Sequence, residues 1–325
     1  MNCLDVGYTN GVIAAREKYL LKDKLIRLCE LTAEDAFRAL VESGFGGGAE
    51  TAISVHDYEK LIAEEERRLD AFIREYAPSK AERAYLLAPR DFHNAKALVK
   101  AAYLGVSPER MLAPAGEVEI ELLSDCIEQK KYDELMAKNE FLAKAIEEAF
   151  SFEELPLGTE IGDIFEKATY EYLRKVSKKN VVLKKLLQAK ADMTNLLTAV
   201  RSENLEEAKK SFLLGGSVTE ERLAALFGSD REQAEGAFKN TAYQAFVKAC
   251  LDARAQGLPL TEAERIRDGY DARFFESRKY ELERNEPFLY YVYRRRNENT
   301  NVRIVFVCLL AGMSETEIKK RLRIW

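Results

Sequence analysis

A short polar motif occurs three times in this chain at a nearly constant interval, and that interval constrains the possible folds. In each copy an acidic residue is followed three positions later by an asparagine and then by an apolar stripe with helical spacing. The three pairs are Asp91 and Asn94, Asp192 and Asn195, and Glu298 and Asn301. The asparagines lie 101 and then 106 residues apart. The spacing predicts that the chain contains three copies of one helical repeat.

A second landmark follows the same period. The segment that ends in Gly116-Glu-Val matches the segment that ends in Gly216-Ser-Val, and the two glycines lie 100 residues apart. Units of this length exceed the roughly 34 to 47 residues of tetratricopeptide and HEAT arrays, so an open array of such repeats is excluded. We expect three pseudo-threefold related repeats that close into one body, a funnel with an axial cavity. The expected repeats are 1–113, 114–214 and 215–325.

Composition predicts an all-α protein with a packed core. Apolar residues make up 47% of the chain and charged residues 32%, with only 7 prolines among 325 residues. Alanine, leucine, glutamate, lysine and arginine are frequent, and all of them favour helices. No β alternation of useful length occurs, which argues against Rossmann-type and barrel enzymes. The net charge of −5 gives no general positive field that would attract nucleic acid or an anionic membrane.

Cysteine usage and hydropathy predict a cytoplasmic protein without a membrane span. The five cysteines are widely spaced and form no C-x-x-C pair, which is typical of reduced thiols rather than of disulfides or a zinc site. The N-terminus lacks the basic and apolar regions of a signal peptide. The longest apolar run, Ile304–Ala311, is far shorter than the roughly 20 residues that a membrane helix needs.

The first 76 residues predict a helical hairpin and a charged helix. Helical spacing covers residues 12–41, where Thr32 is expected to cap the second helix, with Asp35 three residues later. The glycine-rich segment 44–48 is expected to form a flexible turn. Residues 55–76 are rich in glutamate and arginine at helical spacings and predict a helix with a solvated outer face.

Breaks before the motif predict that each acid opens a helix. Pro89 and Pro287 interrupt the first and third copies, and a pause before Asp192 separates residues 183–190 from the second motif helix. An acid at an N-cap accepts a main-chain N–H and contributes about 1 kcal/mol. Capping boxes prefer glutamate or glutamine at the third position, so asparagine in all three copies suggests an additional hydrogen bond to a neighbouring segment. Direct contact of the asparagines with a partner in the axial cavity is the alternative.

Basic residues follow two of the three asparagines. Lys96 and Arg303 occupy equivalent positions, whereas Leu197 breaks the pattern in the second copy. A solvated basic face is one explanation. If the motif helices line an axial opening, these cations would bind carboxylates or helix C-terminal carbonyls of a partner.

A tyrosine-rich segment followed by three arginines lies just before the third motif. The basic residues there are Arg294, Arg295 and Arg296. Such a segment could stack RNA bases, but the acidic total and the absence of a known RNA-binding signature argue against that function. We expect buried tyrosines beneath a basic rim that could dock a protein.

No catalytic, cofactor or metal constellation is present in the sequence. The glycines at 46–48 lack the lysine that follows in a phosphate-binding loop. His56 and His93 lie in separate segments without clustered cysteines or carboxylates. The glutamates at 64–66 are spaced for a helix surface and form no acid and base pair. The sequence therefore predicts a non-enzymatic protein without a cofactor.

These motifs resemble the C subunits of archaeal and bacterial V/A-type ATPases, which are homologous to the d subunit of eukaryotic V-ATPases. The resemblance covers nearly the whole chain. It is carried by Asp91-x-x-Asn94-x-Lys96, Asp192-x-x-Asn195, Glu298-x-x-Asn301-Val-Arg303, Gly312 and Ile318-Lys-Lys-Arg-Leu322. Leu197, the segment 44–48 and the arginine triplet depart from the pattern.

The resemblance implies a funnel-shaped helical adaptor of the central stalk, peripheral to the membrane on its cytoplasmic side. Its partners would be the central-stalk subunits and the membrane rotor ring, and it would transmit torque between ATP turnover and the transport of protons or sodium ions. Two other classes stay open on the residues alone. They are a helical scaffold of a different cytosolic assembly and an RNA-binding helical protein.

Overall fold

The computed structural model describes residues 6–21, 23–48, 53–156, 159–228, 230–276, 278–281 and 285–323. Every regular element in these ranges is a helix, so the all-α class predicted from the sequence is confirmed. Chain contacts define two compact units, one formed by residues 1–79 with 230–325 and the other by residues 80–229. The threefold division and the axial funnel stay predictions. No helix in the described ranges has the length and apolar character that crossing a bilayer requires.

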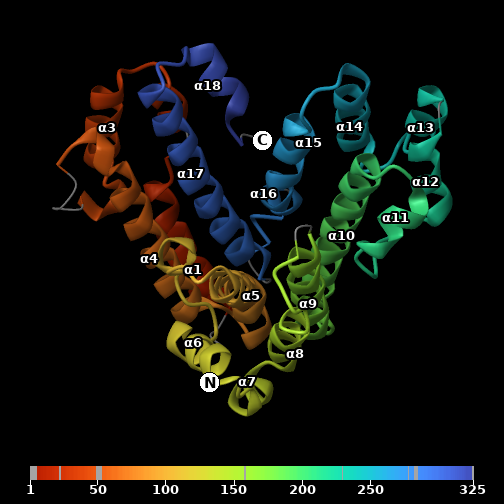
Figure 1. The fold of residues 1–325 in the computed structure, drawn as a ribbon. Coiled ribbons are helices and arrows are strands. Elements are labelled where there is room, and N and C mark those ends of the chain that lie inside the picture. Colours follow the sequence, from red (N-terminus) through yellow and green to blue (C-terminus); the bar gives the residue numbers. More distant parts are fainter. Residues whose placement is uncertain are drawn as a thin grey trace. The chain divides into compact units, whose positions relative to one another are not determined.

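The unit formed by residues 80–229 is built around α5 packed along α9 (Figure 1). Its α-helices are α5 (Lys80–Leu104), α6 (Ile120–Gln129), α7 (Asp133–Lys138), α8 (Glu140–Ala149), α9 (Glu160–Ser177), α10 (Val181–Arg201), α11 (Leu205–Lys210) and α12 (Glu220–Ala224). Short 3₁₀ turns lie at Glu109–Met111 and Ala225–Phe227. Phe92 and Val99 of α5 share a buried apolar cluster with Phe165 of α9 and with residues of α6 and α8. Asn139 and Asn180 cap α8 and α10 through side-chain oxygens that accept main-chain N–H groups.

The other unit is built around α17, which packs against α4, α16 and the first helices of the chain (Figure 1). Its α-helices are α1 (Val6–Arg16), α2 (Asp23–Leu28), α3 (Ala33–Glu42), α4 (Tyr58–Tyr76), α13 (Arg231–Ala237), α14 (Gln244–Gln256), α15 (Thr261–Asp268), α16 (Tyr270–Glu276), α17 (Glu286–Leu310) and α18 (Glu315–Arg321). Short 3₁₀ turns lie at Glu17–Tyr19, Phe45–Gly48 and Val55–Asp57. Phe37, Leu61 and Phe306 are buried together in its core.

Two expectations for the N-terminal segment have different outcomes. The predicted N-cap is confirmed, because the Thr32 hydroxyl accepts the Asp35 N–H at 3.2 Å. The solvated helix predicted at 55–76 is only half right. Helix α4 does expose charged residues, but it also buries an apolar face that includes Leu61 and Phe72 and a carboxylate, Glu65.

The helix breaks predicted just before Asp91 and Asp192 are wrong, whereas the break predicted at Pro287 is confirmed, because α17 begins at Glu286 with this proline in its first turn. Helix α5 runs without interruption through Pro89, although proline removes one main-chain hydrogen bond and costs roughly 3 kcal/mol in a helix interior. The residues beside it, Leu87, Ala88 and Phe92, are almost fully buried, and their packing holds the helix together across that site. Helices α10 and α17 are likewise continuous through their motifs.

Candidate functional site

The first motif ties the middle of α5 to the loop that follows it. The Asn94 Nδ2 group donates to the Ala113 carbonyl at 3.0 Å, and its Oδ1 accepts the Ala113 N–H at 2.8 Å. The Asp91 carboxylate accepts the N–H groups of Gly116, Glu117 and Val118 at 3.0, 2.8 and 3.2 Å. Burial raises the pKa of Asp91 to about 7, and the three N–H donors act in the opposite direction.

The second motif repeats this arrangement on α10. The Asn195 amide donates to the Leu213 carbonyl at 2.9 Å and accepts the Leu213 N–H at 2.7 Å. The Asp192 carboxylate accepts the N–H groups of Ser217 and Val218 at 2.6 and 2.9 Å. It also accepts the Ser217 hydroxyl. Both copies therefore use one acid and one amide to hold one loop.

The two glycines that share the sequence period lie directly over the acids. A Cβ atom added to Gly116 would collide with the Asp91 carboxylate and approach the Leu87 carbonyl oxygen to 2.5 Å. A Cβ on Gly216 would collide with the Asp192 carboxylate in the same way. Only glycine allows the loop main chain to approach the carboxylate this closely.

The third motif holds two segments from opposite ends of the chain. The Asn301 Oδ1 accepts the Arg323 N–H at 2.6 Å, and the Asn301 Nδ2 donates to the Arg323 carbonyl at 3.4 Å. As in the other copies, the asparagine bonds to both main-chain groups of one residue. The Glu298 carboxylate accepts the N–H of Leu21 at 2.9 Å. In this copy the acid therefore holds a segment that precedes α2, whereas Asp91 and Asp192 hold loops that follow their own helices.

The acids do not cap their helices, contrary to the sequence-based expectation. Asp91, Asp192 and Glu298 lie inside α5, α10 and α17, because these helices begin about ten residues upstream. Their side chains bond to the main chain of other segments instead. The additional hydrogen bond expected from each asparagine to a neighbouring segment is present in all three copies.

The basic positions after the asparagines differ in their surroundings. Lys96 is partly buried and lines a groove between α5 and α9, whereas Leu197 is buried in its unit. Arg303 is partly exposed and binds the Glu59 carboxylate with contacts of 2.8 and 2.9 Å. These positions are equivalent in sequence, but their side chains do not have a common role.

The arginine triplet forms only part of the expected rim. Arg295 is 7% exposed and pairs with the buried carboxylates of Glu65 and Glu298, so its assignment to a solvent-facing rim is wrong. A cation at this depth is stable because two carboxylates face it. Arg294 lines a cavity of about 400 Å³, and Arg296 is partly buried. The tyrosines at positions 290, 291 and 293 are buried, as expected.

Glu65 is a member of this polar cluster that sequence reasoning missed. It lies in a run of glutamates with helix-surface spacing, and its partner Arg295 is 230 residues away. Its carboxylate also accepts the Gly46 N–H at 2.9 Å. No local pattern distinguishes Glu65 from the partly exposed glutamates on either side of it, so only the packing of α4 against α17 reveals its role.

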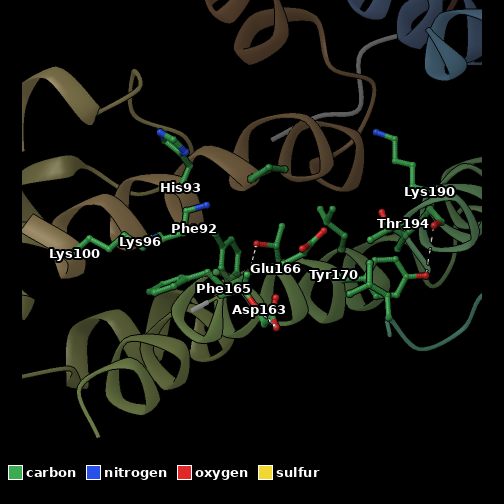
Figure 2. A pocket seen from close by; sticks show the side chains of 17 residues that line it. Phe92, His93, Lys96, Lys100, Asp163, Phe165, Glu166, Tyr170, Lys190 and Thr194 are labelled. Atoms are coloured by element: carbon green, nitrogen blue, oxygen red, sulfur yellow. Dashed lines mark hydrogen bonds between the residues drawn. The ribbon is translucent and has the colours of Figure 1, made fainter. Parts of the chain in front are cut away.

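A groove beside Lys96 lies in the unit of residues 80–229. It has a volume of about 660 Å³ and is lined by α5, α9 and α10 (Figure 2). His93 lies at its edge and contacts the Met111 carbonyl at 3.0 Å. Among the described residues, no three histidine, cysteine or acidic side chains come close enough to hold a metal ion.

The fold and the repeated network define an all-helical protein in which long helices hold distant loops through buried acid and amide side chains. The chain belongs to a known family: the family model described as ATP synthase (C/AC39) subunit matches residues 9–321. It is similar to the C subunit of the V-type sodium ATPase of Enterococcus hirae, with 21% identity over 317 residues. That similarity covers 94% of this chain and 92% of the relative.

Proposed function

We propose that this chain is a non-catalytic central-stalk adaptor of a V/A-type rotary ATPase or ATP synthase. It connects the stalk shaft to the membrane rotor ring and transmits torque for ion transport. The observation that carries the proposal is the family match over residues 9–321. The relative from Enterococcus hirae, by its name the C subunit of a V-type sodium ATPase, supports the same assignment. The protein would lie on the cytoplasmic side, bound to the membrane through the complex.

The side-chain geometry is suited to a part that carries mechanical load. Helices α5 and α17 each contain 25 residues and so extend for about 37 Å. Each is joined at its middle to separate segments by hydrogen bonds from buried acid and amide side chains. Buried, fully bonded polar groups resist displacement because breaking them leaves donors and acceptors unsatisfied.

The proposal includes three repeats around an axial cavity that receives the stalk. In this arrangement the acid and asparagine pairs support assembly indirectly, because they hold the loops that shape the cavity. Partner contacts are assigned to the basic side chains with exposed surface. These are Lys96, Arg294, Arg296 and Arg303.

Detergent extraction of the native complex tests this function. The full chain carries an affinity tag, and the proteins that accompany it are identified by mass spectrometry. The proposal predicts stalk and rotor-ring subunits of one rotary ATPase in fixed ratio to the chain. Stable recovery with another assembly would instead establish the scaffold alternative, and RNA that stays bound in moderate salt would favour the nucleic-acid alternative.

A further inference from the structure

A strongly basic segment joins α9 to α10, here called the basic turn. Residues 174–185 contain six basic residues and no acid, in a chain whose net charge is −5. The six cations, all exposed, are Arg174, Lys175, Lys178, Lys179, Lys184 and Lys185. Within the described part of the chain only one of them has an ion pair, the contact of Lys175 with Glu140 at 2.8 Å. The basic turn therefore carries a local positive charge that the described acids do not balance.

Exposed cations on other helices of this chain are commonly paired with acids one turn away. Lys138 pairs with Glu134 on α7 at 3.1 Å, and Arg231 pairs with Glu235 on α13 at 2.7 Å. Such pairs at helical spacing are the usual way in which a helix surface balances its charge. The basic turn has no acid at any of its twelve positions, so it differs from these surfaces.

The helix dipole explains only part of the basic turn. Arg174 and Lys175 lie in the last turn of α9, where cations are stabilised. Lys184 and Lys185 lie near the start of α10, where the dipole favours acids, and the first turn of α10 contains none. Residues that oppose a local preference are expected at functional sites. Helix stability therefore does not account for the cations at the start of α10.

Hydrogen bonds fix the basic turn on the body of its unit. The Asn180 Oδ1 accepts the N–H groups of Val182 and Leu183 at 3.1 and 3.0 Å. Its Nδ2 donates to the carboxylate of Glu82 at 2.8 Å, and Glu82 is buried on α5. The neighbouring Val181 is 66% exposed. The turn is thus a fixed set of cations with one well-exposed apolar side chain among them in sequence.

The composition of the turn favours an anionic lipid surface over other polyanions. Five of its six cations are lysines, which act as flexible point charges, whereas arginine is suited to paired hydrogen bonds with a single phosphate. The turn contains no aromatic residue that could stack on a nucleic-acid base. Each cation near an anionic membrane strengthens binding roughly fivefold. The acidic remainder of the chain opposes this only weakly, because salt screens charges beyond about 10 Å.

We propose that the basic turn binds the anionic headgroups of a membrane directly. Its lysines lie against the lipid phosphates, and Val181 enters the boundary between headgroups and acyl chains. This inference goes beyond the proposed function, in which other subunits hold the chain at the membrane.

Flotation with lipid vesicles tests the proposal on the purified full chain alone. One set of vesicles contains equal parts of phosphatidylcholine and phosphatidylglycerol, and the other contains phosphatidylcholine only. The chain is expected to float with the anionic vesicles and not with the neutral ones, and its binding should fall as salt is added. Equal binding to both sets, or binding to neither, overturns the proposal.

Charge variants assign the binding to the turn. Lys178→Glu with Lys179→Glu is expected to lower the vesicle-bound fraction at limiting lipid at least about tenfold. Lys178→Arg with Lys179→Arg keeps the charge and should retain binding. The matched control is Lys130→Glu with Lys131→Glu, an exposed adjacent pair that follows α6 in the same unit, and it should leave binding unaltered. Circular dichroism melting of each variant verifies the fold.

The outcomes separate this inference from the proposed function. An equal loss in the two glutamate pairs would mean that net charge alone governs binding, and it overturns the assignment to the turn. If Lys178→Glu with Lys179→Glu leaves vesicle binding intact but removes ATPase subunits or RNA from the purified complex, the turn is a protein or nucleic-acid contact and the lipid proposal is overturned. Absence of ATPase subunits from every purification, the unsubstituted chain included, contradicts the proposed function and leaves the vesicle result unchanged.

Discussion

An asparagine side chain carries the same donor and acceptor as a peptide group, and this explains its use in all three motifs. Asn94 and Asn195 each bond to both the N–H and the carbonyl of one loop residue. Aspartate could not donate, and leucine could do neither. The acids have a complementary role, because the Asp91 carboxylate accepts three successive N–H groups of the loop.

Asn94→Ala should lower the free energy of unfolding by about 2 to 4 kcal/mol, because it leaves the N–H and the carbonyl of Ala113 without partners. Asn195→Ala should do the same at Leu213. Urea denaturation of the full chain measures the change. The exposed neighbour His93, which has one contact to a carbonyl, is the control, and His93→Ala should cost less than about 1 kcal/mol. Equal losses at positions 93 and 94 would contradict the role assigned to the amide.

Glycine at two positions is required by the same network. Gly116→Ala and Gly216→Ala force a methyl group against a buried carboxylate, and each should destabilise the chain by roughly 2 to 4 kcal/mol. Gly162, on α9, has no atom within 4 Å of its ideal Cβ position. Gly162→Ala should therefore be neutral or stabilising by up to about 1 kcal/mol. Melting temperatures compare the three variants, and tolerance of alanine at 116 would show that the loop does not depend on this close approach.

At the scale of elements, α17 joins segments that are far apart in sequence. Arg295 and Glu298 connect it to α4 and to the segment before α2, and Asn301 connects it to the residues after α18. The acid of the third motif therefore holds Leu21, a residue near the start of the chain, in place of a loop after its own helix. The N-terminal segment is an integral part of this unit.

The two arginines of α17 should differ sharply in their contribution to stability. Arg295→Ala removes the buried cation between Glu65 and Glu298, leaving Glu65 with only the longer ion pair to Arg68 at 3.6 Å, and should cost about 3 to 5 kcal/mol. Arg303→Ala removes an ion pair with Glu59 that is largely solvated and should cost less than about 1 kcal/mol. Urea denaturation followed by circular dichroism gives both values. A small loss at Arg295 would mean that its carboxylates find other partners when it is removed.

Sequence periodicity predicted the local features of these elements and missed the distant ones. The Thr32 cap and the shared period of Gly116 and Gly216 are visible because each depends on residues close in sequence or repeated at one interval. The continuity of α5 through Pro89 was missed, since tertiary burial outweighs the local cost of proline. The burial of Arg295 was missed because its partner Glu65 lies on another helix and has an ordinary surface pattern.

At the scale of the whole molecule, the all-α class and the family are established, and the adaptor role is the central claim. Torque transmission requires that the stalk and the ring be joined only while this chain is present. Ion transport should therefore depend on the chain, whereas ATP hydrolysis by the catalytic subunits should not.

ATP-driven ion transport in membrane vesicles from cells that lack this chain tests the claim most directly. The account predicts that the ATP-hydrolysing subunits stay active while transport falls to background. Addition of the purified full chain should restore transport. Transport at the normal level without the chain would contradict the adaptor role.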